Sequence, residues 1–253
     1  MQITAADAEA LCTIARKAGE RIMPYFRRAH GVRSKKDASP VTDADIAAHD
    51  IILEALAKTF PGVAVISEED QMPPQLLRHA PFFLVDPLDG TRSFMRGEGE
   101  FSVNIGLVED CLPRYGVLFA PVLDVLYYGG GGGAFRRRGQ EESERIHCRK
   151  PPESGMVVTR SRSHAAARTQ AYLDSLAIGE ILPASSAVKF GWVADGSADL
   201  YPRFGRTMEW DTAAGHAIVE AAGGRVTLTD GVSPLVYDKP GFENPGFIVR
   251  GLS

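Results

Sequence analysis

Residues 82–91 read FFLVDPLDGT, a run of four apolar residues followed at once by Asp86, Asp89 and Gly90. A short apolar run bounded by turn residues predicts a buried strand, and the two aspartates then stand at its end. Glycine has no Cβ, so the backbone at position 90 can approach a bound anion closely. The stretch therefore predicts a strand that delivers two carboxylates to a site, although Asp86-Pro87 alone could equally be a simple turn.

Two further acidic clusters have a similar placement. Ser67-Glu68-Glu69-Asp70 follows the apolar run 63–66, and Asp211 opens a predicted helix in the stretch WDTAAG, residues 210–215. Carboxylates at strand ends and at a helix start can converge, and there they repel one another unless a cation lies between them. Such oxygen ligands suit Mg²⁺, and a helix start with small residues suits phosphate. Taken singly, the first cluster could be a solvated turn and Asp211 a helix cap.

The first half of the chain predicts two helices and a mainly antiparallel sheet. Apolar residues recur at helical spacing over 11–26 and again over 42–60, where Thr42 and Asp45 form a possible capping box. Five short strands are expected, at 63–66, 82–85, 101–108, 115–119 and 125–128. The five glycines 129–133 favour a loose hairpin or strand edge over a phosphate loop, because no Lys-Ser or Lys-Thr follows them.

Lys150-Pro151-Pro152 is the best candidate boundary, and it divides the chain into halves 1–150 and 151–253. Beyond it strands and helices alternate, which is typical of an α/β arrangement. The strands are expected at 156–159, near 181, at 198–201, and near 226 and 247; the helices at 165–176, 186–194 and 212–222.

Composition narrows the class of protein. The 253 residues carry a formal charge of −4, which argues against a nucleic-acid-binding surface. No apolar run is long enough for a membrane span, and residues 1–23 lack the features of a secretory signal. The cysteines Cys12, Cys111 and Cys148 are widely spaced and indicate reduced thiols rather than a disulfide frame or a zinc site. We therefore expect a cytoplasmic protein, with peripheral attachment to the inner membrane face left open.

Together the motifs closely resemble the inositol monophosphatase superfamily of magnesium-dependent, lithium-sensitive phosphomonoesterases. The signatures are DPLDGT at 86–91 and WDTAAG at 210–215, with SEE at 67–69 and VTDAD at 41–45 upstream in the expected order. Within the superfamily the chain is most similar to the bacterial 3′(2′),5′-bisphosphate nucleotidases of the CysQ type. The segments that carry this narrower match are 99–105, 161–164, 185–190, 198–205 and 244–247.

The resemblance implies a layered α/β/α/β/α sandwich with the site between the two halves. It also implies hydrolysis of 3′-phosphoadenosine 5′-phosphate, a by-product of sulfate assimilation, to AMP, with two or three Mg²⁺ ions. The metal ligands it implies are Glu68, Asp86, the Leu88 carbonyl, Asp89 and Asp211, and the catalytic residues are Glu68, Asp45 and Thr91. Asp45 and Thr91 match the pair that orients and deprotonates the attacking water. The residues it places at the substrate are Glu68, Leu88, Asp89, Gly90, Thr91, Ser163, His164, Ser186, Lys189 and Asp211.

A second phosphate needs cations away from the metals. Lys189 and the stretch 162–164 are the candidates, and the alternative is a surface charge on a helix beside a polar loop. Tyr201 or Phe204 would pack near the base or belong to the core. Arg92-Ser93 stands where this subfamily commonly has Lys-Glu, a departure that bears on substrate preference.

Two other functions remain open at this stage. The first is a different sugar phosphatase, an inositol monophosphatase or a fructose bisphosphatase. The second is a non-catalytic nucleotide-binding regulator, against which the intact set of acidic motifs argues. The expected partner is a small nucleotide bisphosphate, with no nucleic acid and no integral membrane contact, and the chain could be a monomer or a homodimer.

Overall fold

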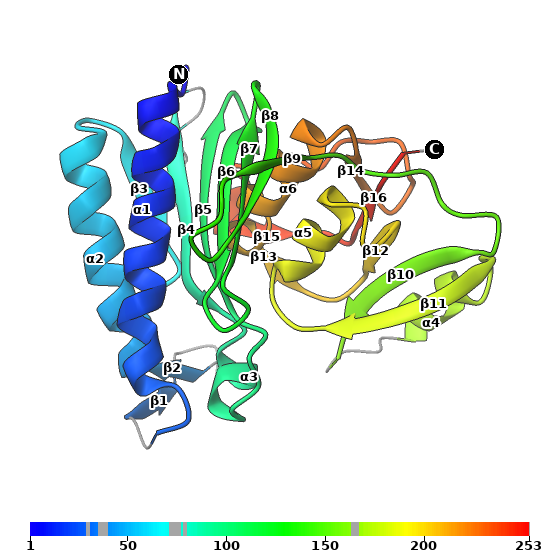
Figure 1. Cartoon of the computed structure of the whole chain (residues 1–253), viewed down its shortest axis with the longest axis horizontal. Helices are drawn as coiled ribbons and strands as arrows, with labels where there is room; N and C mark the ends of the chain where they lie inside the picture. The colour runs from blue at the N-terminus through cyan, green and yellow to red at the C-terminus, as the bar shows by residue number, and fades with distance from the viewer. Residues whose placement is uncertain (29–30, 35–39, 71–76, 78–79, 163–166, 253) are drawn as a thin grey trace.

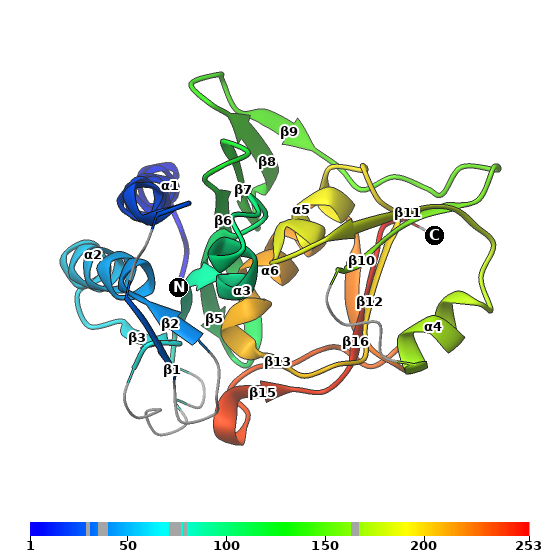
Figure 2. The same ribbon diagram turned by 90° about the horizontal axis from the view of Figure 1, so that it is seen from below.

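The computed structural model describes residues 1–28, 31–34, 40–70, 77, 80–162 and 167–252, and they form five alternating layers (Figures 1 and 2). Helices α1 (Ala5–Ile22) and α2 (Asp43–Thr59) cover one face of a seven-stranded sheet. Helices α5 (Val188–Ala194) and α6 (Ala213–Ala221) fill the space between this sheet and a five-stranded one. Helix α4 (Ala167–Leu173) packs on the outer face of the second sheet. The expected α/β/α/β/α sandwich is confirmed.

The large sheet has the strand order β3-β4-β5-β6-β7-β8-β9, and only β3 runs parallel to its neighbour. Its strands are β3 (Ala64–Ser67), β4 (Phe82–Asp89), β5 (Ser102–Glu109), β6 (Leu112–Ala120), β7 (Val125–Gly130), β8 (Gly133–Arg138) and β9 (Glu144–Ile146). The mainly antiparallel sheet is therefore confirmed. Gly130 pairs with Gly133, so residues 131–132 form the hairpin turn that the glycine run predicted.

Both faces of β4 are buried, which explains its unbroken apolar sequence. Phe83 and Val85 pack against the layer of α1 and α2, whereas Phe82 and Leu84 pack toward α5 and α6. Asp86 and Asp89 therefore stand at the C-terminal end of β4, beyond the residues that pack in the two apolar layers.

A row of glycines crosses the middle of this sheet. Gly106, Gly116 and Gly129 are cross-strand partners on β5, β6 and β7. Helix α6 lies directly on them: a Cβ at Gly106 would lie 2.7 Å from the Ala213 Cβ, and one at Gly116 would lie 2.0 Å from the Ala214 carbonyl oxygen. The row fixes how closely α6 approaches the sheet, and hence the position of the chain just before α6.

The second sheet has the order β11-β10-β12-β16-β14, with β11, β10 and β12 parallel and the other pairs antiparallel. Its strands are β10 (Met156–Ser161), β11 (Ile178–Ala184), β12 (Leu200–Arg203), β14 (Arg225–Leu228) and β16 (Phe247–Arg250). The α/β character predicted for this half is confirmed. The helices predicted from 186 and 212 begin later, and Ser186 has a positive φ of 55° that no right-handed helix contains. The boundary at 150 stays a prediction.

The remaining elements are short. They are β1 (Val32–Ser34), β2 (Pro40–Thr42), α3 (Thr91–Met95), β13 (Thr207–Met208), β15 (Glu243–Asn244) and the 3₁₀ turns Met23–Tyr25, Glu209–Asp211 and Pro240–Phe242. Among the described residues, no helix combines the length and the apolar character needed to cross a membrane.

Candidate active site

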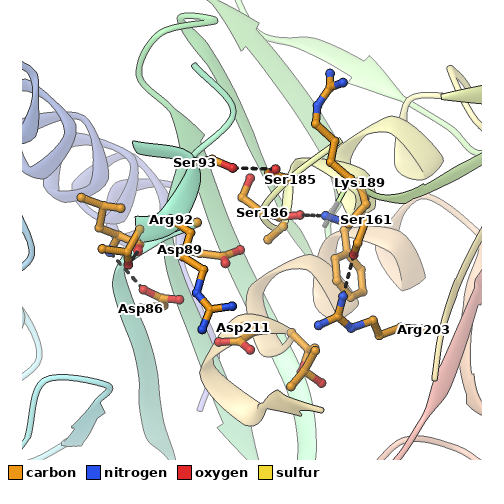
Figure 3. A pocket seen from close by; sticks show the side chains of 18 of the residues that line it. Asp86, Asp89, Arg92, Ser93, Ser161, Ser185, Ser186, Lys189, Arg203 and Asp211 are labelled. Carbon is orange, nitrogen blue, oxygen red and sulfur yellow. Dashed lines mark hydrogen bonds between the residues drawn. The ribbon is translucent and has the colours of Figure 1, made fainter. Parts of the chain in front are cut away.

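A pocket of about 280 Å³ opens between the two sheets: carboxylates gather at one wall, Lys189 and Arg203 lie at the other, and Arg92 of α3 reaches toward the carboxylates (Figure 3). The acidic wall comes from the ends of β3 and β4 and from the segment before α6. The other wall comes from β12 and from the turn before α5. The lining includes Glu68, Asp86, Leu88, Asp89, Gly90, Thr91, Arg92, Ser161, Arg162, Ser185, Ser186, Lys189, Tyr201, Arg203, Asp211 and Thr212.

The β4 end of the pocket depends on an irregularity in the sheet. The β4–β5 register shifts between Asp86 and Asp89, so both aspartates reach the pocket although they are three residues apart. The Asp86 carboxylate accepts a hydrogen bond from the Leu88 N–H at 3.0 Å. Gly90 then turns the chain with a φ of 94°, and a Cβ there would lie 3.2 Å from the Glu100 carbonyl oxygen and 3.4 Å from the Ser186 Cβ. The positive φ favours glycine here, and the close approach of the Glu100 carbonyl adds to that preference.

Glu68 and Asp211 approach these aspartates from two other directions. Strand β3 runs parallel to β4, and the Glu68 N–H donates to the Val85 carbonyl at 3.0 Å, which fixes Glu68 beside Asp86. Asp211 ends the turn before α6, where its carboxylate accepts the Met208 N–H at 2.8 Å. One carboxylate oxygen each from Glu68, Asp86 and Asp211 lies within 4.8 Å of the others.

The pKa values of two of these acids reflect their crowding. Burial raises the pKa of Asp89, and the charge of Glu68 adds to that, although Lys189 and the Ala187 N–H oppose it. Burial also raises the pKa of Asp211 well above its ordinary value, and Asp89 and Glu68 add to the rise. A cation between the carboxylates would reverse this repulsion. The donor set consists of oxygens alone and therefore fits a hard divalent ion such as Mg²⁺.

Asp45 and Thr91 meet at the edge of the pocket. Asp45 lies in the first turn of α2, where its Oδ2 accepts hydrogen bonds from the Thr42 N–H at 2.7 Å and the Thr42 hydroxyl at 2.6 Å. The capping box is therefore present, and it does not exclude a second contact. The Thr91 hydroxyl lies 3.3 Å from Asp45 Oδ1 and 3.2 Å from the Leu88 carbonyl oxygen.

Lys189 lies inside the protein at the far wall of the pocket. Its side chain is 3% exposed, so the alternative of a surface charge on a helix is wrong. Its ammonium donates to the carbonyls of Ser186 and Ala184 and lies 5.1 Å from the centre of the Tyr201 ring. Burial lowers the pKa of Lys189 to about 8, with the charge of Asp89 acting in the opposite direction.

The sequence pattern of the inositol monophosphatase family matches residues 5–246. The chain belongs to this family. The 3′(2′),5′-bisphosphate nucleotidase CysQ of Salmonella typhimurium is 43% identical over 245 residues, which cover 95% of this chain and 98% of that protein. The CysQ structure from Bacteroides thetaiotaomicron matches with a TM-score of 0.82 and 36% identity over 97% of each chain. An inositol monophosphatase from Anabaena matches with a TM-score of 0.76 and 26% identity, over 97% of this chain and 90% of that one.

The inositol monophosphatase fold brings most of the predicted site residues to one pocket. Nine line it, namely Glu68, Asp86, Leu88, Asp89, Gly90, Thr91, Ser186, Lys189 and Asp211, and Asp45 reaches it through Thr91. Ser163 and His164 lie outside the described residues. Of the two aromatic candidates, Tyr201 lines the pocket, whereas Phe204 packs on Tyr172 with ring centres 5.5 Å apart.

Arg203 of this inositol monophosphatase family member was not among the predicted site residues. Its side chain lines the pocket and donates to the Ser161 hydroxyl at 2.6 Å (Figure 3), and its buried Nε has no hydrogen-bond partner among the described residues. Arg203 stands within the quoted stretch 198–205, but an arginine at the end of a predicted strand is ordinary. Arg162, by contrast, was a candidate for the second phosphate, and its guanidinium is bound to Glu100.

Proposed function

We propose that the protein is a Mg²⁺-dependent 3′(2′),5′-bisphosphate nucleotidase that hydrolyses 3′-phosphoadenosine 5′-phosphate to AMP and phosphate. The observation that carries the proposal is the division of the pocket into two walls. Carboxylates from three segments meet on one wall, and the buried Lys189 lies on the other. A substrate with two separate phosphates suits this division. The relatives named as 3′(2′),5′-bisphosphate nucleotidases support the choice of substrate.

Glu68, Asp86, Asp89, Asp211 and the Leu88 carbonyl would hold the metal, as two or three ions. When bound, Mg²⁺ would supply positive charge that makes water a better nucleophile and offsets the charge of the leaving oxygen. The protein residues hold the acids in place for this. The Leu88 N–H orients Asp86, the Met208 N–H orients Asp211 and the Ala187 N–H orients Asp89.

Asp45 and Thr91 would receive the proton of the attacking water. The Thr91 hydroxyl can donate to Asp45 Oδ1 while its oxygen accepts from a water in the pocket. Two hydrogen bonds from Thr42 hold Oδ2 of Asp45, which directs Oδ1 toward the Thr91 hydroxyl. The pair therefore orients water and carries its proton away from the reacting phosphate.

The reacting phosphate would lie between the carboxylate wall and the start of α6. Gly90 lets the backbone come close to it, and Thr212 faces it from the N-terminal end of α6, where anions are favoured. Lys189 and Ser186, with Arg203 beside them, would bind the second phosphate. The sulfate ester 3′-phosphoadenosine 5′-phosphosulfate carries the same 3′-phosphate and is a second possible substrate.

The test is a comparison of hydrolysis rates with saturating Mg²⁺. We expect 3′-phosphoadenosine 5′-phosphate to be preferred over inositol 1-phosphate and fructose 1,6-bisphosphate, with activity lost on chelation and inhibited by lithium. A preference for either sugar phosphate would replace the proposed substrate. Tight nucleotide binding without turnover would instead make the protein a non-catalytic regulator. The cytoplasmic location and the oligomeric state stay predictions.

A further inference from the structure

We infer that Glu100 and Arg162 form a positioning pair that holds the turn 185–187, and that through this turn they orient Asp89 and Lys189. The expected effect on substrate binding rests on the proposed function. The expected effect on Mg²⁺ binding rests only on the cluster of carboxylates in the pocket. Glu100 is neither a metal ligand, nor part of the water-orienting pair, nor a phosphate contact, whereas Arg162 lines the pocket with its guanidinium bound to Glu100.

Glu100 joins three segments that are far apart in the sequence. Its Oε2 accepts the Ser185 N–H at 2.9 Å and the Arg162 Nε–H at 2.8 Å, and its Oε1 accepts an Arg162 Nη2–H at 2.5 Å. The Glu100 side chain is only 18% exposed. Burial opposes ionisation, but the hydrogen bonds from Arg162 and Ser185 lower the pKa of Glu100 overall. The carboxylate is thus held in its charged form between β10 and the turn.

The turn that Glu100 holds is strained. Ser186 is not a glycine, yet its φ of 55° lies in the left-handed region. Such a conformation persists only when its surroundings fix it. The Ser185 N–H is fixed by Glu100, and the Ser185 hydroxyl accepts a hydrogen bond from the Ser93 hydroxyl at 2.7 Å, as Figure 3 shows. Gly90 lies against the other side of the turn, where a Cβ would be in van der Waals contact with the Ser186 Cβ at 3.4 Å.

The same turn contacts two groups of the active site. The Ala187 N–H donates to the Asp89 carboxylate, and the Ser186 carbonyl accepts from the Lys189 ammonium. Both contacts are made by the single peptide group that joins Ser186 to Ala187, and this group would rotate if Ser186 relaxed out of the left-handed region. Asp89 would lose a hydrogen-bond donor that holds its carboxylate in place, and Lys189 would lose an acceptor that fixes its ammonium. Glu100 does not itself line the pocket, and it acts on Asp89 and Lys189 through the turn that it holds.

An ordinary surface ion pair would have no such effect, and the chain offers a matched control. Glu9 and Arg137 form the same two-pronged pair, with hydrogen bonds of 2.9 and 2.7 Å, between α1 and β8. Glu9 is 58% exposed and contacts no residue of the active-site pocket. Such exposed pairs contribute little to stability. Glu9→Ala should therefore leave Mg²⁺ binding and turnover within about twofold of the wild type.

The experiment compares Glu100→Ala, Glu100→Gln, Arg162→Met and Glu9→Ala in the full-length protein. Calorimetry gives the Kd for Mg²⁺ without substrate, and steady-state assays give kcat and KM for 3′-phosphoadenosine 5′-phosphate. In Glu100→Ala we expect the Kd and the KM each to rise on the order of tenfold, since a hydrogen bond to a charged group is lost. Glu100→Gln should recover part of the loss, because its amide oxygen can still accept the Ser185 N–H. Arg162→Met should raise the Kd and the KM less than Glu100→Ala does, because the Glu100 carboxylate remains and can still accept the Ser185 N–H.

Unchanged Kd and KM in Glu100→Ala, or changes no larger than those in Glu9→Ala, would overturn the inference. So would a fall in melting temperature with both constants unchanged, because the pair would then serve stability alone. If Glu100→Ala does not fold, Glu100→Gln and Arg162→Met decide the question by the same two constants. Absence of hydrolysis by the wild type would contradict the proposed function, and the Mg²⁺ titrations would still test the pair.

Discussion

The contact between α6 and the glycine row leads to a prediction for Gly116→Ala. A Cβ at this position would lie 2.0 Å from the Ala214 carbonyl oxygen, whereas carbon and oxygen atoms normally approach to about 3.4 Å. The obstacle is backbone of a helix and cannot rotate away. The N-terminal turn of α6 must therefore move by at least about 1 Å, and Asp211 lies just ahead of that turn.

The effects of Gly116→Ala on stability and on turnover can both be estimated. Overpacking of this kind costs about 1–3 kcal/mol in the free energy of unfolding, which lowers the melting temperature of a chain of this size by about 2–12 °C. A displacement of about 1 Å in a catalytic group reduces turnover by about a hundredfold. We therefore expect Gly116→Ala to lower the melting temperature, raise the Kd for Mg²⁺ and strongly reduce kcat.

Gly131→Ala is the matched control, because a Cβ there meets nothing within 4 Å and its φ is not positive. Thermal unfolding and Mg²⁺ calorimetry are measured for both variants. The free energy of unfolding of Gly131→Ala should stay within about 0.5 kcal/mol of the wild-type value. If Gly116→Ala matched the control in both measurements, the packing argument would be refuted. A lower melting temperature with unchanged Mg²⁺ affinity would show that the glycine row does not set the position of Asp211.

Three further predictions concern the site itself. Asp89→Asn should abolish turnover and weaken Mg²⁺ binding in a folded protein, since one anionic ligand is lost, whereas Asp43→Asn at an exposed position of α2 should change kcat little; the reverse ranking would contradict the assignment. Lys189→Ala should reduce kcat/KM for 3′-phosphoadenosine 5′-phosphate about ten- to a hundredfold and act far less on a substrate with one phosphate; equal losses would make Lys189 a structural residue. The raised pKa of Asp211 means that the metal-free folded protein keeps a proton which the unfolded chain has released, so its stability falls as pH rises from about 4 toward that raised pKa. Mg²⁺ must displace this proton, and the gain in melting temperature on adding Mg²⁺ should therefore grow over the same pH range; a gain that shrinks with pH would refute the carboxylate assignment.

Much of the large sheet could be predicted because strands that are buried on both faces have continuous apolar sequences. The apolar run 82–85 predicted β4, and the turn residues after it predicted where the carboxylates stand. Strand β8 was missed because its residues 136–138 are three arginines. In the structure the Arg136 guanidinium donates hydrogen bonds to Glu144 and to the buried side chain of Asp195. The local sequence pattern does not predict these contacts. Long-range ion pairs of this kind override strand propensity.

The site residues that stand in short sequence motifs could be predicted. The residues that act through packing between distant segments could not. Asp86, Asp89 and Asp211 stand in recognisable motifs. The glycine row does not, because Gly106 and Gly116 are single glycines inside apolar runs and are ordinarily interpreted as weak points of a strand. Their role appears only when α6 lies on them. Glu100 was quoted as part of a matching segment, but its link to Ser185 joins positions that only the fold brings together.

The position of α6 on the glycine row has a consequence for how the protein is synthesised. Strands β4 to β7 pair with neighbours in the sequence, so this sheet can form early on the ribosome. Helix α6 and Asp211 come from the last fifth of the sequence. Until they emerge, the nascent sheet presents its bare glycine face and carries an incomplete acidic cluster. A partly translated chain therefore lacks one carboxylate of the acidic cluster and leaves the glycine face of its sheet without the helix that covers it.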